Sequence, residues 1–236
     1  MLKIVIERAD KIYSITASEI KKVMENTNRP VLALPTGNTP TSLYRLLSVD
    51  KTIDWSKVVI FMLDCYYPQD KNDPLSFYTY IKNNLLDNIN LPPENFHMLD
   101  SQALNPEQEC LKYEKEIQEA GGLDLAILGL GENCHIAFCE PGTPQDSLTH
   151  VTNISTQTIL VNNVDKVENF PTKALTVGIK TILSARKIMV LAKGEKKALS
   201  VKRSLTENPS AECPASFLQN HPNITYMLDS EAAALL

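Results

Sequence analysis

A carboxylate and a histidine that could transfer protons each follow a strongly apolar run of the chain. Asp64 comes directly after the run at 58–63. A carboxylate that ends a buried strand is partly desolvated, which raises its pKa towards that of a working base. His135 lies in a glycine-flanked loop after the run at 123–130, and Glu140 five residues on could complete a proton-relay pair. The alternatives are structural: a helix cap or solvated loop acid for Asp64, and a structural histidine for His135.

A third polar segment could hold a phosphate. Thr36-Gly37-Asn38-Thr39 precedes Pro40, which is expected at the first position of a helix. Two hydroxyls, an amide, a glycine for close backbone approach and the N–H groups of a helix start suit an anion. The segment matches neither the nucleotide P-loop nor the dinucleotide fingerprint, and a plain capped turn is the alternative. Lys193, Lys196 and Lys197 cluster around another predicted helix start, where one could add a charge for a phosphate or simply be solvated.

The cysteines suggest two other kinds of chemistry. Cys134, His135 and Cys139 could be zinc ligands, although their spacing matches no usual ligand pattern and no second pair completes the set. Cys134 or Cys65 could be a nucleophile activated by a histidine, although neighbours in sequence need not face each other. Five scattered cysteines and no signal-peptide pattern predict reduced thiols and a cytoplasmic location.

The order of elements predicts where these residues meet. Strands are expected at 2–6, 31–34, 58–63, 95–99, 123–130, 156–161, 174–179, 188–191 and 224–228, and helices mainly in between. This alternation predicts an α/β fold with three layers, αβα, around a mostly parallel, Rossmann-like sheet. No composition break divides the chain, so residues 1–236 are expected to form a single domain. Such sheets bind ligands at the carboxyl ends of their strands, where the three polar segments lie.

Composition excludes several classes of protein. The chain is 43% hydrophobic and 22% charged, without a biased tract, which excludes disordered and fibrous proteins. A net charge of −5 without a basic face argues against a nucleic-acid partner. No apolar run approaches the length of a membrane span, so no membrane partner is expected.

Several stretches, in this order, resemble the glucosamine-6-phosphate deaminase/isomerase family, which shares its fold with the 6-phosphogluconolactonases. The most specific stretches are 34–40, 123–131 and 135–142, supported by 174–178 and 215–221. The resemblance covers nearly the whole chain. It implies a small sugar phosphate as the substrate, with no metal ion and no organic cofactor, and it leaves self-association into a homo-oligomer open.

The resemblance implies a role for each candidate residue. Asp64 matches the base that moves a proton between C2 and C1 of the open-chain sugar. His135 matches the residue that opens the pyranose ring, and Glu140 matches its carboxylate partner. The loop Thr36–Thr39 matches the phosphate cradle, and Lys197 matches a lysine that contacts the phosphate.

The chain departs from the family pattern within this site. Asn133 and Cys134 stand where the family often has Asp and Gly, and Cys65 follows the base where Glu is usual. The lid segment 160–170, which usually supplies a phosphate-binding Arg, has only Lys166 as a basic residue. Asn133 can orient the neighbouring histidine but cannot carry charge, and it is counted with the catalytic residues in that sense. Together these departures favour the galactosamine-6-phosphate branch.

The sequence therefore predicts isomerisation and deamination of an amino-sugar 6-phosphate, from galactosamine or glucosamine, to a ketose 6-phosphate and ammonia. One alternative is a 6-phosphogluconolactonase-type hydrolase, although that branch usually has Asp-Glu-Arg and His-Thr-Ala-Ser where this chain has Asp64-Cys65-Tyr66 and His135-Ile136-Ala137-Phe138. The other is a non-catalytic sugar-phosphate sensor, which Asn133 and Cys65 suggest.

Overall fold

The computed structural model describes residues 1–161, 167, 168 and 170–236, and its centre is a seven-stranded, entirely parallel sheet. Across the sheet the strands are β1 (Leu2–Ile6), β10 (Ile224–Leu228), β9 (Ile188–Ala192), β6 (Leu125–Gly129), β2 (Val31–Leu34), β3 (Val59–Met62) and β5 (Phe96–His97). The chain builds outward from β2 in one direction and from β6 in the other. The boundary between β2 and β6 is therefore the switch point in strand order, where such sheets bind ligands.

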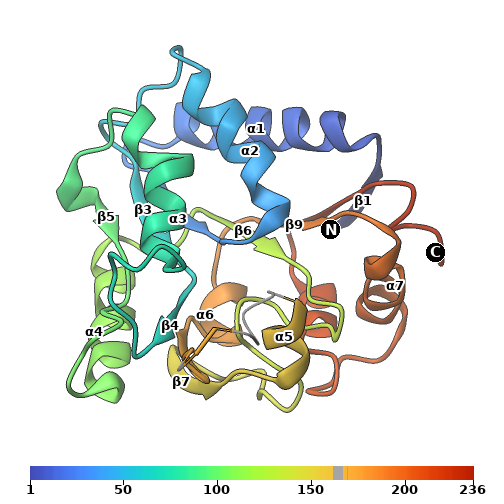
Figure 1. The fold of residues 1–236 in the computed structure, drawn as a ribbon. Helices are drawn as coiled ribbons and strands as arrows, with labels where there is room; N and C mark the ends of the chain where they lie inside the picture. Colours follow the sequence, from blue (N-terminus) through green and yellow to red (C-terminus); the bar gives the residue numbers. More distant parts are fainter. Residues whose placement is uncertain (162–166, 169) are drawn as a thin grey trace.

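Helices cover both faces of this sheet (Figure 1). One face carries α1 (Ala9–Asn26), α2 (Asn38–Val49) and α3 (Phe77–Asn84), and the other carries α4 (Pro106–Glu119), α6 (Ile179–Leu183) and α7 (Ala198–Thr206). Successive side chains of a strand point to opposite faces. In β2, Leu32 and Leu34 pack with the first set of helices, while Val31 and Ala33 pack with the second. Burial on both faces explains why the strands are continuous apolar runs, and the three-layer α/β prediction is confirmed.

A second sheet, which the sequence analysis does not anticipate, stands beside the first. It is antiparallel and contains β4 (Asp64–Tyr67), β8 (Lys173–Thr176) and β7 (His150–Asn153). The chain changes sheets at Leu63, whose N–H donates to the Leu34 carbonyl (3.1 Å) and whose carbonyl accepts from Val177 (2.8 Å). The predicted strand at 174–179 therefore belongs mostly to this smaller sheet, and its last residue begins α6.

The strand predicted at 156–161 is wrong, because these residues form the short helix α5 (Thr156–Val161). Threonine, isoleucine and valine favour a strand, but the Ser155 hydroxyl accepts the N–H of Thr158 (3.1 Å) and starts a helical turn. Lys166 lies outside the described residues.

Short 3₁₀ helices complete the described elements: η1 (Leu86–Asn88), η2 (Pro93–Asn95), η3 (Glu195–Lys197) and η4 (Pro214–Asn220). The helix predicted at 194–205 is thus a 3₁₀ turn followed by α7. Among the described helices, none combines the length and the apolar character that crossing a membrane requires.

Candidate active site

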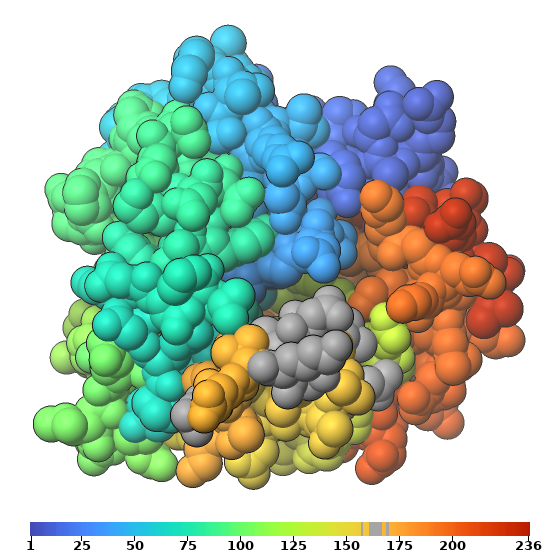
Figure 2. Space-filling view, in the orientation of Figure 1, coloured from blue at the N-terminus to red at the C-terminus, as the bar shows by residue number. Residues whose placement is uncertain are grey.

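The three polar segments meet around one cavity of about 420 Å³ at the carboxyl ends of β2, β3 and β6, beside the lysines that follow β9. This volume lies within the range of sites for small molecules. Asp64, His135, Lys197 and the loop Thr36–Thr39 all line the cavity. In the space-filling view of this side, light-blue residues of α2 and orange residues that follow β9 approach each other near the centre (Figure 2). The cavity therefore lies at the switch point of the main sheet.

The loop after β2 forms one end of the cavity. Gly37 precedes the first residue of α2 and has a φ of +104°, a left-handed conformation that suits glycine. Its carbonyl accepts hydrogen bonds from the hydroxyls of Tyr80 (2.7 Å) and Thr41 (3.1 Å), which fix the loop from outside the cavity. Because α2 begins at Asn38, Pro40 occupies its third position, not its first as predicted. An N–H is still dispensable there, since the first turn lacks partners for its N–H groups.

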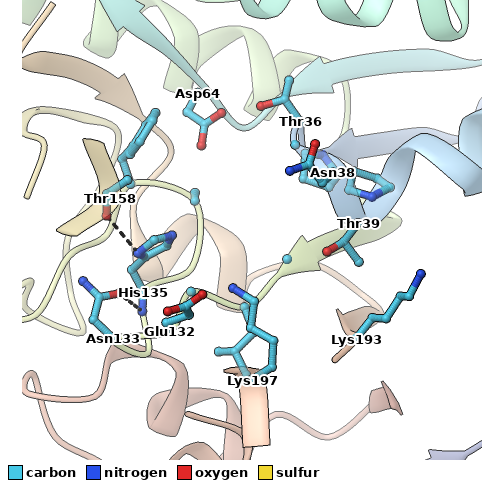
Figure 3. Close-up of a pocket in the computed structure, with 18 of the residues that line it drawn as sticks. Thr36, Asn38, Thr39, Asp64, Glu132, Asn133, His135, Thr158, Lys193 and Lys197 are labelled. Atoms are coloured by element: carbon cyan, nitrogen blue, oxygen red, sulfur yellow. Dashed lines mark hydrogen bonds between the residues drawn. The ribbon is translucent and has the colours of Figure 1, made fainter. Parts of the chain in front are cut away.

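Lysines stand next to this loop. Lys197 is half-buried and lines the cavity with the exposed Lys193 and Lys196. Burial lowers the pKa of the Lys197 ammonium, and the charge of Glu132 opposes that shift. Figure 3 shows the amino group of Lys197 beside Glu132, between His135 and the loop residue Thr39, and across the cavity from Asp64. This end of the cavity thus combines hydroxyls, a helix start and positive charge, as an anion requires.

Asp64, the first residue of β4, points into the cavity (Figure 3). Its side chain is only 6% exposed, and its Oδ1 atom lacks a hydrogen-bond partner among the described residues. Burial raises the pKa of this carboxyl to about 7, as the position after an apolar run predicts. Asp64 is therefore neither a solvated loop acid nor a helix cap, and its pKa suits a general base at neutral pH.

His135 and Glu140 come together as predicted. Glu140 is 8% exposed and lies behind the ring, and its Oε2 atom is 3.7 Å from Nδ1 of His135. Asn133 joins them: its Nδ2 donates to Glu140 Oε2 (2.6 Å), and its Oδ1 accepts the backbone N–H of His135 (3.3 Å). Burial raises the pKa of Glu140, but the neighbouring His135 first, and then hydrogen bonds from Thr158 and Asn133, outweigh burial and lower the pKa to about 2. Glu140 is therefore ionised at neutral pH.

The loop that carries His135 requires a residue without a side chain at one position and a left-handed backbone conformation at another. A side chain on Gly131 would put its Cβ 2.4 to 2.6 Å from ring atoms of His135, so this position requires glycine. The Gly131 N–H donates to the carbonyl of His135 (2.9 Å). Cys134 adopts a φ of +70°, which explains why glycine suits this position in the family pattern.

The structure does not support a cysteine nucleophile. Cys65 is 1% exposed and its thiol donates to the Leu99 carbonyl (3.6 Å) inside the core, while Cys134 is completely buried. Burial raises the pKa of Cys65, and a hydrogen bond with Cys213, together with burial, raises that of Cys134. Neither residue lines the cavity. Within the described part of the chain, no three His, Cys, Asp or Glu side chains group as metal ligands. The thiol of Cys139 instead donates a hydrogen bond to the Val177 carbonyl (3.3 Å).

Thr158, which α5 brings to the cavity, was not predicted from the sequence. Its hydroxyl is 2.6 Å from Glu140 Oε1 and 3.4 Å from His135 Nδ1. Ser155 was the available signal, because serine is a preferred N-cap whose hydroxyl accepts the backbone N–H three residues later, here that of Thr158.

An aromatic wall of the cavity was not predicted either. Tyr66, Phe77 and Phe138 line the cavity, and the parallel rings of Phe77 and Phe138 lie 5.9 Å apart.

Comparison with known proteins gives one consistent family. A family model for glucosamine-6-phosphate isomerases/6-phosphogluconolactonase matches residues 6–227. A glucosamine-6-phosphate deaminase of Mycoplasmopsis pulmonis is 39% identical over 233 residues, which cover 95% of this chain and 91% of that protein. One of Alkaliphilus oremlandii is 43% identical over 211 residues, or 87% of this chain and 88% of that protein.

Two solved structures are similar over nearly the whole chain. A monomeric glucosamine-6-phosphate deaminase has a TM-score of 0.95 at 32% identity, covering 100% of this chain and 99% of that one. A 6-phosphogluconolactonase from Thermotoga maritima has a TM-score of 0.79 at 24% identity, covering 97% and 99%, which shows the shared fold alone.

Proposed function

This chain belongs to the family of glucosamine-6-phosphate isomerases and 6-phosphogluconolactonases, and we propose that it deaminates and isomerises glucosamine 6-phosphate to a ketose 6-phosphate and ammonia. One observation carries the proposal: a buried carboxylate without a hydrogen-bond partner on Oδ1, Asp64, shares a cavity with a histidine that is backed by an ionised glutamate. Relatives named glucosamine-6-phosphate deaminases at 37–43% identity support the same activity.

The substrate phosphate binds at the end of the cavity that is formed by the loop Thr36–Thr39 and Lys197. The phosphate carries nearly two negative charges, and the protein is acidic overall, so local donors must hold it. Thr36, Asn38 and Thr39 supply side-chain donors, Gly37 allows close approach, and the ammonium of Lys197 supplies charge. This placement puts the carbon atoms of the sugar towards the other end of the cavity.

His135 opens the pyranose ring. Its imidazole takes the proton of the anomeric hydroxyl and returns a proton to the ring oxygen, which breaks the bond between C1 and that oxygen and leaves an open-chain aldehyde. Ionised Glu140 stabilises the imidazolium that exists between the two transfers.

Asp64 then transfers a proton between neighbouring carbons. It removes the C2 proton while the C1 carbonyl oxygen gains a proton, which gives an enaminol, and it delivers a proton to C1, which leaves an iminium at C2. Water hydrolyses that iminium to the ketone and ammonia. A pKa of about 7 balances basicity against the need to be deprotonated at neutral pH.

The hydrolase and sensor alternatives have less support. The lactonase comparison given above lies under 25% identity and carries the fold only. A sensor needs no desolvated base, whereas burial of Asp64 without a partner on Oδ1 costs stability that a purely binding protein has no reason to lose.

The C4 epimer is the finer question. The relatives named above favour glucosamine 6-phosphate, and the preference for galactosamine 6-phosphate remains a prediction of the sequence analysis. Both ends of the Asn133 amide already bind within the loop, to Glu140 and to the His135 N–H. This argues that Asn133 orients the histidine and does not select a sugar hydroxyl.

One assay tests these assignments. Ammonia release should be measured from glucosamine 6-phosphate and galactosamine 6-phosphate, with wild type, Asp64→Asn and Asn133→Asp. We expect turnover of the glucosamine epimer by wild type and none by Asp64→Asn. Sugar-phosphate binding without ammonia from either epimer would favour the sensor, and hydrolysis of a 6-phosphogluconolactone would favour the hydrolase.

We also propose that the chain acts as a monomer, because the solved relative at 32% identity is described as monomeric. Sedimentation velocity at micromolar concentration should give the mass of one chain, and a larger species that alone carries the activity would contradict this.

A further inference from the structure

We propose that Thr158 is a positioning residue that holds His135 in the tautomer with the proton on Nδ1, so that Nε2 is free to accept a proton from the sugar. The inference deepens the proposed deaminase function and rests on it for its catalytic consequence. The tautomer itself, however, follows from hydrogen bonds inside the protein and can be measured without any substrate.

The hydroxyl of Thr158 lies where three polar groups converge. The residue is 4% exposed, so water has little access to it. Its Oγ1 is 2.6 Å from Glu140 Oε1, 2.9 Å from the Ser155 hydroxyl and 3.4 Å from His135 Nδ1. A buried hydroxyl with three neighbours must distribute its one hydrogen and two lone pairs among them.

Only one distribution satisfies all three neighbours. Ionised Glu140 has no hydrogen to offer, so Thr158 donates its hydrogen to Oε1. The Ser155 oxygen already accepts the backbone N–H of Thr158, and its own hydrogen points to Thr158 Oγ1. The remaining lone pair of Thr158 faces Nδ1 of His135, which must then be the donor.

Glu140 supports the same tautomer from a second direction. Its Oε2 atom is 3.7 Å from Nδ1, beyond hydrogen-bond distance, and already accepts from Asn133 at 2.6 Å. If the ring carried its proton on Nε2 instead, the Nδ1 lone pair would face a lone pair of Thr158 and a carboxylate. Both contacts would be repulsive in a site that is largely closed to water.

The consequence for chemistry lies on the other side of the ring. Figure 3 shows the second ring nitrogen of His135 turned towards the cavity, with Thr158 behind the ring. With Nδ1 protonated, this Nε2 carries the lone pair that ring opening needs. In this arrangement Thr158 acts through His135, because its hydroxyl is engaged with Glu140, Ser155 and the imidazole ring.

The experiment compares Thr158→Val, which keeps the shape but loses the hydroxyl, with Thr158→Ser, which keeps the hydroxyl. Nitrogen-15 NMR of histidine-labelled protein reports which ring nitrogen is protonated, and His135→Gln assigns the His135 signals. We expect Nδ1–H in wild type and Thr158→Ser, and a substantial Nε2–H fraction in Thr158→Val. For glucosamine 6-phosphate, kcat should fall about 10-fold to 100-fold in Thr158→Val and change little in Thr158→Ser. KM should move less than kcat in both variants.

Each outcome bears on the inference. Wild-type His135 with its proton on Nε2, or a folded Thr158→Val variant that keeps both the Nδ1–H signal and the wild-type kcat, would overturn it. If Thr158→Val does not fold, the inference is still tested by the wild-type tautomer and by Thr158→Ser, both of which should carry the proton on Nδ1. If wild type releases no ammonia from any amino-sugar phosphate, the proposed function fails, whereas the NMR result still tests the tautomer.

Discussion

Replacing the buried base should make the protein inactive and should raise its stability relative to wild type as the pH rises from acidic to neutral. Burial raises the pKa of Asp64 from 3.8, the ordinary value for an aspartate, to about 7. In the unfolded chain this carboxyl ionises near its ordinary value. Between these two pH values the native state therefore binds more protons than the unfolded state, so stability falls as the pH rises.

The size of the effect follows from that interval. It spans roughly three pH units, each worth about 1.4 kcal/mol, so ionised Asp64 lowers the free energy of unfolding by about 4 kcal/mol above pH 7. Asp64→Asn removes this titration. The difference in unfolding free energy, variant minus wild type, should rise by about 4 kcal/mol between pH 4 and pH 8, whatever the fixed cost of burying the amide.

Urea unfolding at unit steps of pH measures this difference directly. Asp54→Asn is the matched control, because hydrogen bonds from Ser56 and Asn90 lower the pKa of this exposed carboxyl and its difference from wild type should stay flat between pH 5 and pH 8. A flat difference for Asp64→Asn over the same range would refute the reasoning. In wild type, kcat/KM should rise about tenfold per unit up to a pKa near 7, since only ionised Asp64 acts as the base.

Two further substitutions test the two ends of the cavity. Lys197→Ala should raise KM about tenfold or more and change kcat less, because a phosphate contact is shared by ground and transition states. The control Lys202→Ala, on the exposed face of α7, should match wild type. A collapse of kcat in Lys197→Ala with an unchanged KM would count against the phosphate role. Gly131→Ala should lower kcat about 100-fold by displacing the ring of His135, since its Cβ would lie 2.4 to 2.6 Å from ring atoms. Gly129→Ala adds the same methyl group where nothing lies within 4 Å and should cost less, so equal losses in kinetics with glucosamine 6-phosphate would contradict the collision.

Much of the fold was predictable because strands that are buried on both faces are continuous apolar runs in the sequence. The strands at 2–6, 31–34 and 224–228 match the structure to the residue. The errors arise where local preference and tertiary context disagree. Residues 156–161 are rich in β-branched side chains, yet the cap from Ser155 turns them into a helix.

The main residues of the site were predictable from the sequence, but the hydrogen bonds between them were not. Position after an apolar run identifies Asp64 and places His135 in a loop at the sheet edge, because parallel strands end at one side. Nothing in the spacing shows that Asn133 would bind Glu140 instead of the imidazole ring, or that Thr158 would bind Glu140 from a helix further along the chain. Such contacts depend on how separate loops fold against one another.

The unpredicted second sheet explains how the base and the histidine loop keep their relative positions. Asp64 in β4 pairs with Thr176 in β8, which is completely buried. The hydroxyl of Thr176 accepts the backbone N–H of Phe138 (3.0 Å), which anchors the loop of His135 to the same strand. One residue of β8 therefore contacts both the strand that carries Asp64 and the loop that carries His135. The proposed catalytic pair, fixed in this way, needs no direct contact between its members, and under the proposed function the sugar occupies the space between them.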